Sequence, residues 1–177
     1  MPNAINKHPL QLIKFYYFWL LFTRIMREKI ILFGLLIATA TSCISTRNTI
    51  KNIDDKAPMP ALSADRNFIL TEKATDTKYG YDPDYPVNLG FMPVQSAEIN
   101  VKRFFGALTG PEGQEVSYRL VDSCCPFPSG KNNMGAGLLD IYEVTWQGLK
   151  EPKRIHINLY ERGRIMAPAG FGIKEIK

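Results

Sequence analysis

Two adjacent cysteines, Cys124 and Cys125, are the residues whose chemistry is easiest to name. An oxidising compartment would favour a disulfide, and a bond between neighbours would close a strained ring of the labile, exposed kind. One interpretation is therefore a redox-active or disulfide-bonded pair. The other places the two thiols on opposite sides of the chain, one of them buried as a small hydrophobe, and the usual behaviour of buried cysteine favours it. The Cys-x-x-Cys spacing of thioredoxin-like enzymes is absent.

A metal site would need more ligands than the sequence supplies. The histidines are His8, in a leader segment described below, and His156. His156 with Cys124 and Cys125 makes three ligands at most, and a structural zinc site has four. Alternation along the chain places His156 on the polar face of a strand. We expect no metal, no cofactor and no catalytic residue.

A loop rich in tyrosine is the second candidate site. It spans residues 79–86 and combines Tyr79, Tyr81 and Tyr85 with the carboxylates Asp82 and Asp84. These side chains could bind a cation, a sugar stacked on the rings, or an envelope protein. The alternative is that the tyrosines hold the loop on the domain while the carboxylates accept hydrogen bonds from turn amides.

The elements that position these residues can be read from periodicity. The segment 97–108 predicts a helix, because Val101, Phe104, Phe105 and Leu108 recur at helical spacing. Ser96 is its expected N-cap, and Gly110 with the proline after it ends it.

Period-two alternation predicts strands over 116–120, 142–146, 155–160 and 164–166, with shorter strands near 68–72 and 87–91. Alternation with tight turns indicates an antiparallel sheet that is covered on one side. We expect an α+β domain over residues 66–177, with one helix packed on a small antiparallel sheet of about four to six strands.

The N-terminal region looks like a lipoprotein signal. Residues 27–29 are charged, residues 30–38 are apolar, and small residues lead to Cys43. The run Ala40-Thr41-Ser42-Cys43 resembles a bacterial lipobox, although Leu is usual where Ala40 stands. Because the apolar run is shorter than a bilayer span of ~20 residues, a membrane helix is the less favoured alternative. We expect residues 26–42 to be a cleaved signal peptide and residues 1–25 an upstream mis-start.

In that family of signals the cysteine carries two or three acyl chains, palmitate among them, which anchor a protein stably where one chain would not. Cys43 is therefore the expected lipidation site. The residues after it lack the sorting cues for inner-membrane retention or surface export, which favours an outer-membrane lipoprotein facing the periplasm. We interpret residues 43–65, polar and with two prolines, as a tether.

The charge distribution argues against nucleic-acid binding. Residues 1–42 hold five Lys/Arg and one acidic residue, whereas residues 43–177 hold 17 Lys/Arg and 16 Asp/Glu. A nucleic-acid binder concentrates its basic residues on the folded domain. An anion pocket built from Arg119, Lys131, Arg154 and Arg164 is an alternative to scattered surface charge, and the near balance favours scatter.

Several stretches resemble a family of small envelope lipoproteins of Bacteroidota-type bacteria. The resemblance covers nearly all of residues 43–171 and is carried by residues 79–88, 103–105, 108–113, 124–127 and 134–144. Proteins of this kind sometimes carry the label 2-dehydro-3-deoxyphosphooctonate aldolase (3-deoxy-8-phosphooctulonate synthase). The resemblance supplies no catalytic residues.

Two classes of function follow. The leading expectation is a lipid-anchored envelope protein that acts as a non-catalytic binding or structural module for a protein or a glycan. The alternative is an envelope enzyme, either the labelled aldolase or a thiol-redox protein using the cysteine pair. The synthase chemistry belongs to a (β/α)₈ barrel of ~250 residues, whereas residues 43–177 read as antiparallel strands.

Overall fold

The structure is a computed structural model that describes Trp19 and residues 49–175. The chain divides into two units, Met1–Ile44 and Ser45–Lys177. The expected mis-start over 1–25 (Trp19 excepted), the signal over 26–42 and the lipidation site Cys43 lie outside the described residues. Within the described ranges, no helix has the length and apolarity needed to span a bilayer.

A four-stranded sheet forms the framework of the second unit. Its strands lie in the order β1 (Val87–Asn88), β5 (Lys153–Asn158), β4 (Ala136–Thr145) and β3 (Ser117–Pro128). The β3–β4 and β4–β5 pairs are antiparallel, and the β1–β5 pair is parallel. The expected α+β class is confirmed, but the sheet is mixed. The parallel pair arises because a helix and two long strands separate β1 from β5 and form the crossover that parallel pairing requires.

The remaining strands are short. β2 (Leu108–Thr109) and β6 (Gly172–Ile173) form a separate two-stranded antiparallel sheet that sequence periodicity did not indicate. The strand expected at 68–72 is reduced to one bridge, between Phe68 and Leu62, and residues 164–166 form no strand. Lys73 and Ala167, one residue beyond these two ranges, form a bridge with each other. Runs this short carry too few residues for alternation to reveal them.

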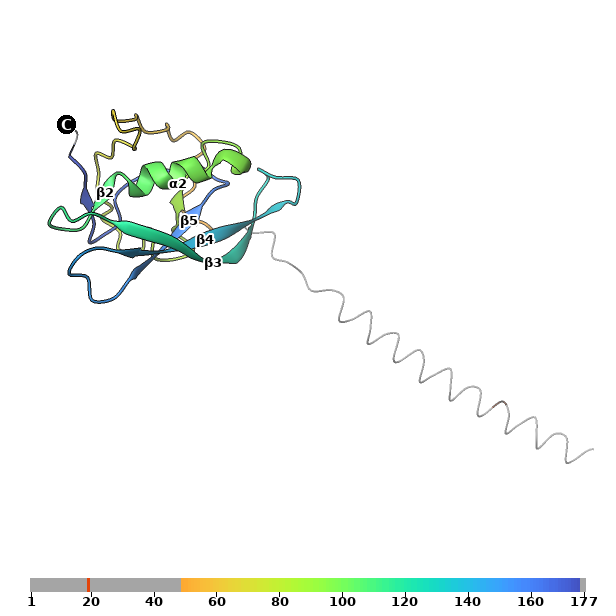
Figure 1. Cartoon of the computed structure of the whole chain (residues 1–177). Helices are drawn as coiled ribbons and strands as arrows, with labels where there is room; N and C mark the ends of the chain where they lie inside the picture. Colours follow the sequence, from red (N-terminus) through yellow and green to blue (C-terminus); the bar gives the residue numbers. More distant parts are fainter. Residues whose placement is uncertain (1–18, 20–48, 176–177) are drawn as a thin grey trace, which may run out of the picture. The chain divides into compact units, whose positions relative to one another are not determined.

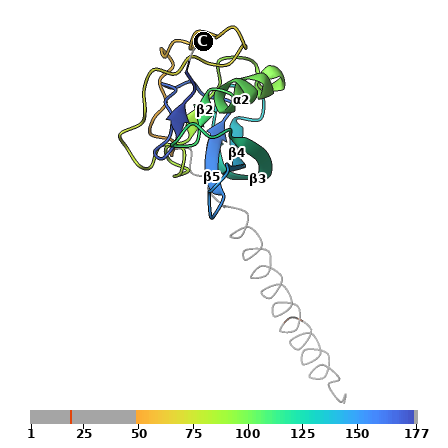
Figure 2. The ribbon, with the colours of Figure 1, turned by 60° about the vertical axis from the view of Figure 1, so that its left-hand side comes forward.

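One short helix covers the sheet. α2 (Glu98–Phe105) follows a 3₁₀ turn, η1 (Val94–Ser96), and lies across the face formed by β3, β4 and β5 (Figures 1 and 2). The expected helix over 97–108 is correct in place but too long at its C-terminal end, where Gly106 follows and the chain enters β2. Ser96 is not the N-cap. Ala97 occupies that position without a side-chain hydrogen bond, because Ser96 belongs to the preceding 3₁₀ turn.

The apolar stripe of α2 makes the main core with the inner face of the sheet. Phe104 and Phe105 are almost completely buried, and the ring of Phe105 packs against Tyr142 at 5.3 Å between centroids. This burial of large apolar side chains is the main source of stability for the domain. Other buried members of the core include Val101, Val144, Ile155, Ile157, Leu89, Phe68 and Phe171.

A chain of buried asparagine amides joins β1, β5 and the N-terminal segment. The Asn158 amide donates to Asn88 Oδ1 at 2.9 Å, and the Asn88 amide donates to the backbone oxygen of Asn52 at 2.9 Å. Asn158 Oδ1 in turn accepts from the backbone amides of Tyr160 and Glu161. Gly163 lies so close to this cluster that a Cβ there would be 2.8 Å from the Asn88 amide nitrogen.

Residues expected to form the C-terminal part of the tether pack against the domain. Ile50 and Ala57 are buried. The Lys51 amide donates to the Asp84 carbonyl at 2.9 Å, and the Asp54 amide donates to the Arg162 carbonyl at 2.8 Å. The described contacts of the domain therefore begin well before residue 66.

The asparagine cluster predicts a large effect of a small substitution. Asn158→Ala should lower the free energy of unfolding by about 2–4 kcal/mol, because it leaves the Asn88 side-chain carbonyl and the backbone amides of Tyr160 and Glu161 without this partner. Urea denaturation measures the change. Asn133→Ala, at an exposed position, is the control and should stay within about 0.5 kcal/mol of the parent. Equal stability of the two variants would contradict the role given to Asn158.

Candidate functional site

A bulge in β3 decides which face of the sheet carries the cysteines. Leu120 pairs with Tyr142 and Asp122 pairs with Ile141, so β3 advances two residues where β4 advances one. One extra residue moves every following side chain to the opposite face. Cys124 therefore lies on the face away from α2, whereas Leu120 lies on the face toward it.

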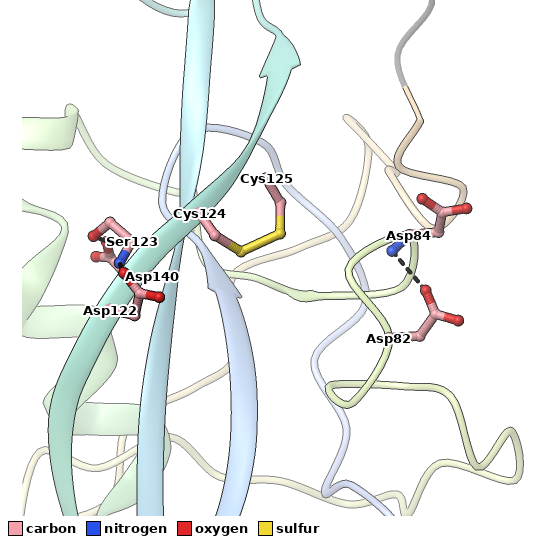
Figure 3. The surroundings of a disulfide bond; sticks show 7 residues. All are labelled: Asp82, Asp84, Asp122, Ser123, Cys124, Cys125 and Asp140. Carbon is pink, nitrogen blue, oxygen red and sulfur yellow. Dashed lines mark hydrogen bonds between the residues drawn. A yellow bond between two sulfur atoms is a disulfide. The ribbon is translucent and has the colours of Figure 1, made fainter.

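Cys124 and Cys125 form a disulfide with each other, with their Cα atoms 3.7 Å apart (Figure 3). The interpretation that placed the two thiols on opposite sides of the chain is wrong. Cys125 adopts a positive φ of 58°, a conformation that costs a non-glycine residue of order 1–3 kcal/mol and is found most often at functional sites. A second register shift in β3, between Cys124 and Phe127, accommodates it.

The structure brings His156 to this disulfide. A ligand nitrogen of His156 and the two Sγ atoms all lie within 4.8 Å of one another. His156 pairs with Ile141 on β4, which pairs in turn with Asp122 on β3. His156 therefore lies on the same face of the sheet as Cys124, because the bulge turns Cys124 to that face. The sequence indicated all three residues as candidates. It contained no pattern that predicts the bulge, which brings Cys124 to the same face as His156.

The imidazole of His156 is half-buried. Its Nδ1 atom is buried and makes no hydrogen bond to any residue the structure describes. Burial lowers the pKa of His156 below its ordinary value, while the backbone of Gly80 and Tyr81 and the carboxylate of Asp82 act in the opposite direction. Burial favours the neutral imidazole, which has a nitrogen lone pair that can accept a hydrogen bond or ligate a metal ion.

The tyrosine loop runs past the same histidine. The His156 amide donates to the Gly80 carbonyl at 2.7 Å. The Tyr79 hydroxyl donates to the Arg164 carbonyl at 3.2 Å, and the Tyr81 hydroxyl donates to the Ala169 carbonyl at 2.6 Å. Burial raises the pKa of Tyr81 to about 12. These two phenols therefore hold the loop on the domain and are not free for a ligand.

The acidic residues of the loop are also engaged within it. Asp82 Oδ1 accepts from the Asp84 amide at 2.8 Å (Figure 3). The Asp84 carboxylate pairs with the Lys51 ammonium group at 3.3 Å. That ammonium group also lies 5.6 Å from the Tyr85 ring centroid. Of the two interpretations of this loop, these contacts support the one in which its carboxylates and rings stabilise the loop itself.

The four basic residues considered for an anion pocket do not converge. Arg119 and Arg154 flank the carboxylate of Glu143. Lys131 pairs with Asp55 at 3.1 Å, and Arg164 pairs with Glu72. Each cation already has a carboxylate partner, although Arg119 and Arg154 share one, and surface ion pairs of this kind contribute little to stability.

A groove between α2 and β3 is a further candidate surface that the sequence did not indicate. It has a volume of about 490 Å³ and is lined by Ile99 and Lys102 of α2 and by Tyr118, Leu120 and Tyr142 of the sheet. Ile99 is 42% exposed and Leu120 is 53% exposed. The sheet order leaves β3 outermost, and no described residue pairs with its outer edge.

A second hollow, of about 460 Å³, lies beside Phe91, Tyr160 and Arg162. The Arg162 guanidinium lies over the Phe91 ring at 5.8 Å from its centroid. Lys131 and Asp55, which also line the hollow, are paired with each other. Its polar groups are thus partnered within the domain, and the hollow offers fewer free contacts than the groove beside β3.

Comparisons with protein-family models, curated proteins and solved structures found no match.

The environment of His156 predicts a pH-dependent stability. A buried neutral histidine binds a proton less readily than in the unfolded chain, where its pKa is about 6.5. The free energy of unfolding should therefore fall as the pH drops below that value, until the lowered pKa of the folded state is reached. Chemical denaturation from about pH 7.5 to about pH 5.5 measures this loss. His156→Gln should reduce it, and an equal loss in both proteins would contradict the prediction.

Proposed function

We propose that this chain is a lipid-anchored envelope protein whose folded domain is a non-catalytic binding module. The anchor is supported by the lipobox-like run ending at Cys43 and by the family resemblance. The second unit of the chain begins at Ser45, directly after that run. Ile50, the first buried residue that the structure describes, lies seven residues after Cys43 in the sequence.

The observation that carries the binding role is the outer edge of β3. This strand is 12 residues long, and in the described residues its outer backbone groups have no strand partner. Proteins usually shorten, charge or cover such an edge because it pairs readily with another chain. Here the edge adjoins the groove that contains the exposed Leu120 and Ile99 side chains.

The partner that fits these features is an extended protein segment. Its backbone would add a strand to β3, and its alternate side chains would lie in the groove against α2, as in other cases of strand addition. A glycan would use fewer of these groups, because the groove contains exposed aliphatic side chains and the edge presents regularly spaced backbone donors and acceptors.

The architecture does not favour the aldolase activity attached to the resembling family. The described sheet has four strands in mixed order, whereas the synthase chemistry is associated with a closed barrel of eight parallel strands. The basic side chains considered for an anion pocket, Arg119, Lys131, Arg154 and Arg164, are all engaged in ion pairs with carboxylates. A thiol-redox role remains the second candidate, because the disulfide and His156 lie together.

The anchor is tested by metabolic labelling with a clickable fatty acid. The full chain should incorporate the label and fractionate with the outer membrane, because acylation occurs on the Cys43 thiol. Cys43→Ser should lose both properties. The double variant Cys124→Ser, Cys125→Ser keeps Cys43 and is the control that should retain the label. Label on the Cys43→Ser protein would refute lipidation at this residue.

The binding surface is tested by site-specific photo-crosslinking in cells. A photoreactive amino acid in place of Leu120 should give a discrete protein adduct, because the groove side chain would contact the partner. The same amino acid in place of Met134, which is 88% exposed in the turn after β3, is the control and should give none. Adding Ile99→Glu should reduce the adduct at position 120, since it places a charge in the groove.

Three results would contradict the proposed surface. The first is equal adducts at both positions, which would indicate random encounter. The second is an adduct at position 120 that Ile99→Glu does not change. The third is attachment to polysaccharide in place of protein, which would assign the groove to a glycan.

A further inference from the structure

The disulfide and His156 form a cluster that the proposed binding role does not use. The groove lies on the face of the sheet covered by α2, and the cluster lies on the opposite face. Figure 3 shows the disulfide on the side of β3 toward the loop of Asp82 and Asp84, with Ser123 and Asp140 on the other side. The side chains of the cluster therefore lie on the face of the sheet opposite to the groove.

Three atoms that can ligate a soft metal ion, two cysteine sulfurs and one histidine nitrogen, lie close together in this cluster. Cys124 Sγ, Cys125 Sγ and one imidazole nitrogen of His156 lie within 4.8 Å of one another. The residues come from two strands of one sheet, β3 and β5, which are both tied to β4. A site on sheet strands is held more precisely than one on loops.

The Nδ1 atom of His156 adds an independent observation. It is buried and has no hydrogen-bond partner among the described residues. A buried polar atom without a partner is costly, and in native structures it often marks a functional group or a bound ion. The positive φ of Cys125 is a second cost at the same place.

The disulfide form is not the binding form, because the metal ligand is the thiolate. A dithiol reductant supplies two electrons and two protons, so the S–S bond breaks, two thiols form and the reductant becomes a disulfide. Binding of a cation then displaces the two thiol protons to solvent, and two sulfur–metal bonds form. The imidazole contributes its lone pair without a change in oxidation state.

We propose that reduction of the Cys124–Cys125 disulfide converts this cluster into a three-ligand site for a soft monovalent cation, Cu⁺, bound by Cys124, Cys125 and His156. Thiolate ligands select Cu⁺ and Zn²⁺ among the common metals. Three ligands complete a trigonal site for Cu⁺, whereas a structural Zn²⁺ site takes four. Exchange with a disulfide oxidant re-forms the Cys124–Cys125 bond: the oxidant takes two electrons from the two thiolates and two protons from solvent and becomes a dithiol. This removes two of the three ligands and releases the metal.

The test is a Cu⁺ titration of the full chain in detergent under anaerobic conditions, in competition with a chromophoric Cu⁺ chelator. All proteins carry Cys43→Ala, so that the cysteine pair supplies the only thiols. The reduced protein should bind one equivalent of Cu⁺ and develop an ultraviolet sulfur-to-copper charge-transfer band. The same protein in its disulfide form should bind none. This comparison involves no substitution within the domain and so cannot be confused with misfolding.

Two variants identify the ligands. Cys124→Ser with Cys125→Ser should abolish the charge-transfer band. His156→Gln should keep the band but weaken Cu⁺ binding at least about tenfold, since loss of a group that merely supports a ligand has an effect of that size. Circular dichroism of each variant confirms that the domain is folded. A parallel titration with Zn²⁺ should show weaker competition with Cu⁺ for the same thiols.

Several outcomes would overturn the proposal. Equal Cu⁺ binding by the reduced and disulfide forms would show that the cysteines are not the ligands. An unchanged affinity in a folded His156→Gln protein would remove the histidine from the site. Displacement of Cu⁺ by an equal concentration of Zn²⁺ would assign the site to the divalent metal.

Discussion

The hydrogen bond between the Asn158 and Asn88 side chains joins two strands of the sheet across 70 residues of sequence. It joins the parallel pair β1–β5 from within the core. Through the Asn88 amide the same chain of bonds reaches Asn52, and through Asn158 Oδ1 it fixes the backbone as it leaves β5. Buried amides of this kind must all be satisfied together, so they specify one arrangement of strands.

That arrangement places β1 beside β5 and leaves β3 at the opposite edge of the sheet. The edge position of β3 then follows from the order of the strands and not from the composition of β3. The phenylalanine side chains of α2 pack on the sheet, with Phe105 stacked on Tyr118 of β3, but Leu120 and Ile99 stay exposed at the rim. The groove is thus a consequence of a helix of eight residues lying on a sheet wider than the helix can cover.

The bulge between Leu120 and Asp122 turns the two parts of β3 toward opposite faces of the sheet. Before the bulge, its side chains Tyr118 and Leu120 lie with α2. After it, Cys124 lies on the other face beside His156. A regular strand would have placed Leu120 and Cys124 on one face, because they are four residues apart. The bulge therefore places the groove beside α2 and the cysteine–histidine cluster on opposite faces of the sheet.

The sequence alone determined the elements whose pattern is local. It located α2 from the spacing of Val101, Phe104 and Phe105, and the α+β class from helix and strands together. Alternation located only part of the long strands: the predicted 116–120 and 142–146 fall on β3 and β4, but residues 121–128 and 136–141 were not predicted to be strand. Its expectation of lipidation at Cys43 also rests on local residue types, and it remains a proposal. The sequence placed Tyr79 and Tyr81 in a loop, and of the two interpretations the structure supports the one in which they anchor it.

Only the tertiary structure decided what depends on pairing between distant segments. The parallel contact of β1 with β5, the unpaired edge of β3 and the meeting of His156 with Cys124 all result from strand order and register. Periodicity gives each strand two faces, but it does not say which face of one strand matches which face of the next. A single unpaired residue such as that at the bulge reverses the assignment, and hydrophobic alternation over a few residues contains no record of it.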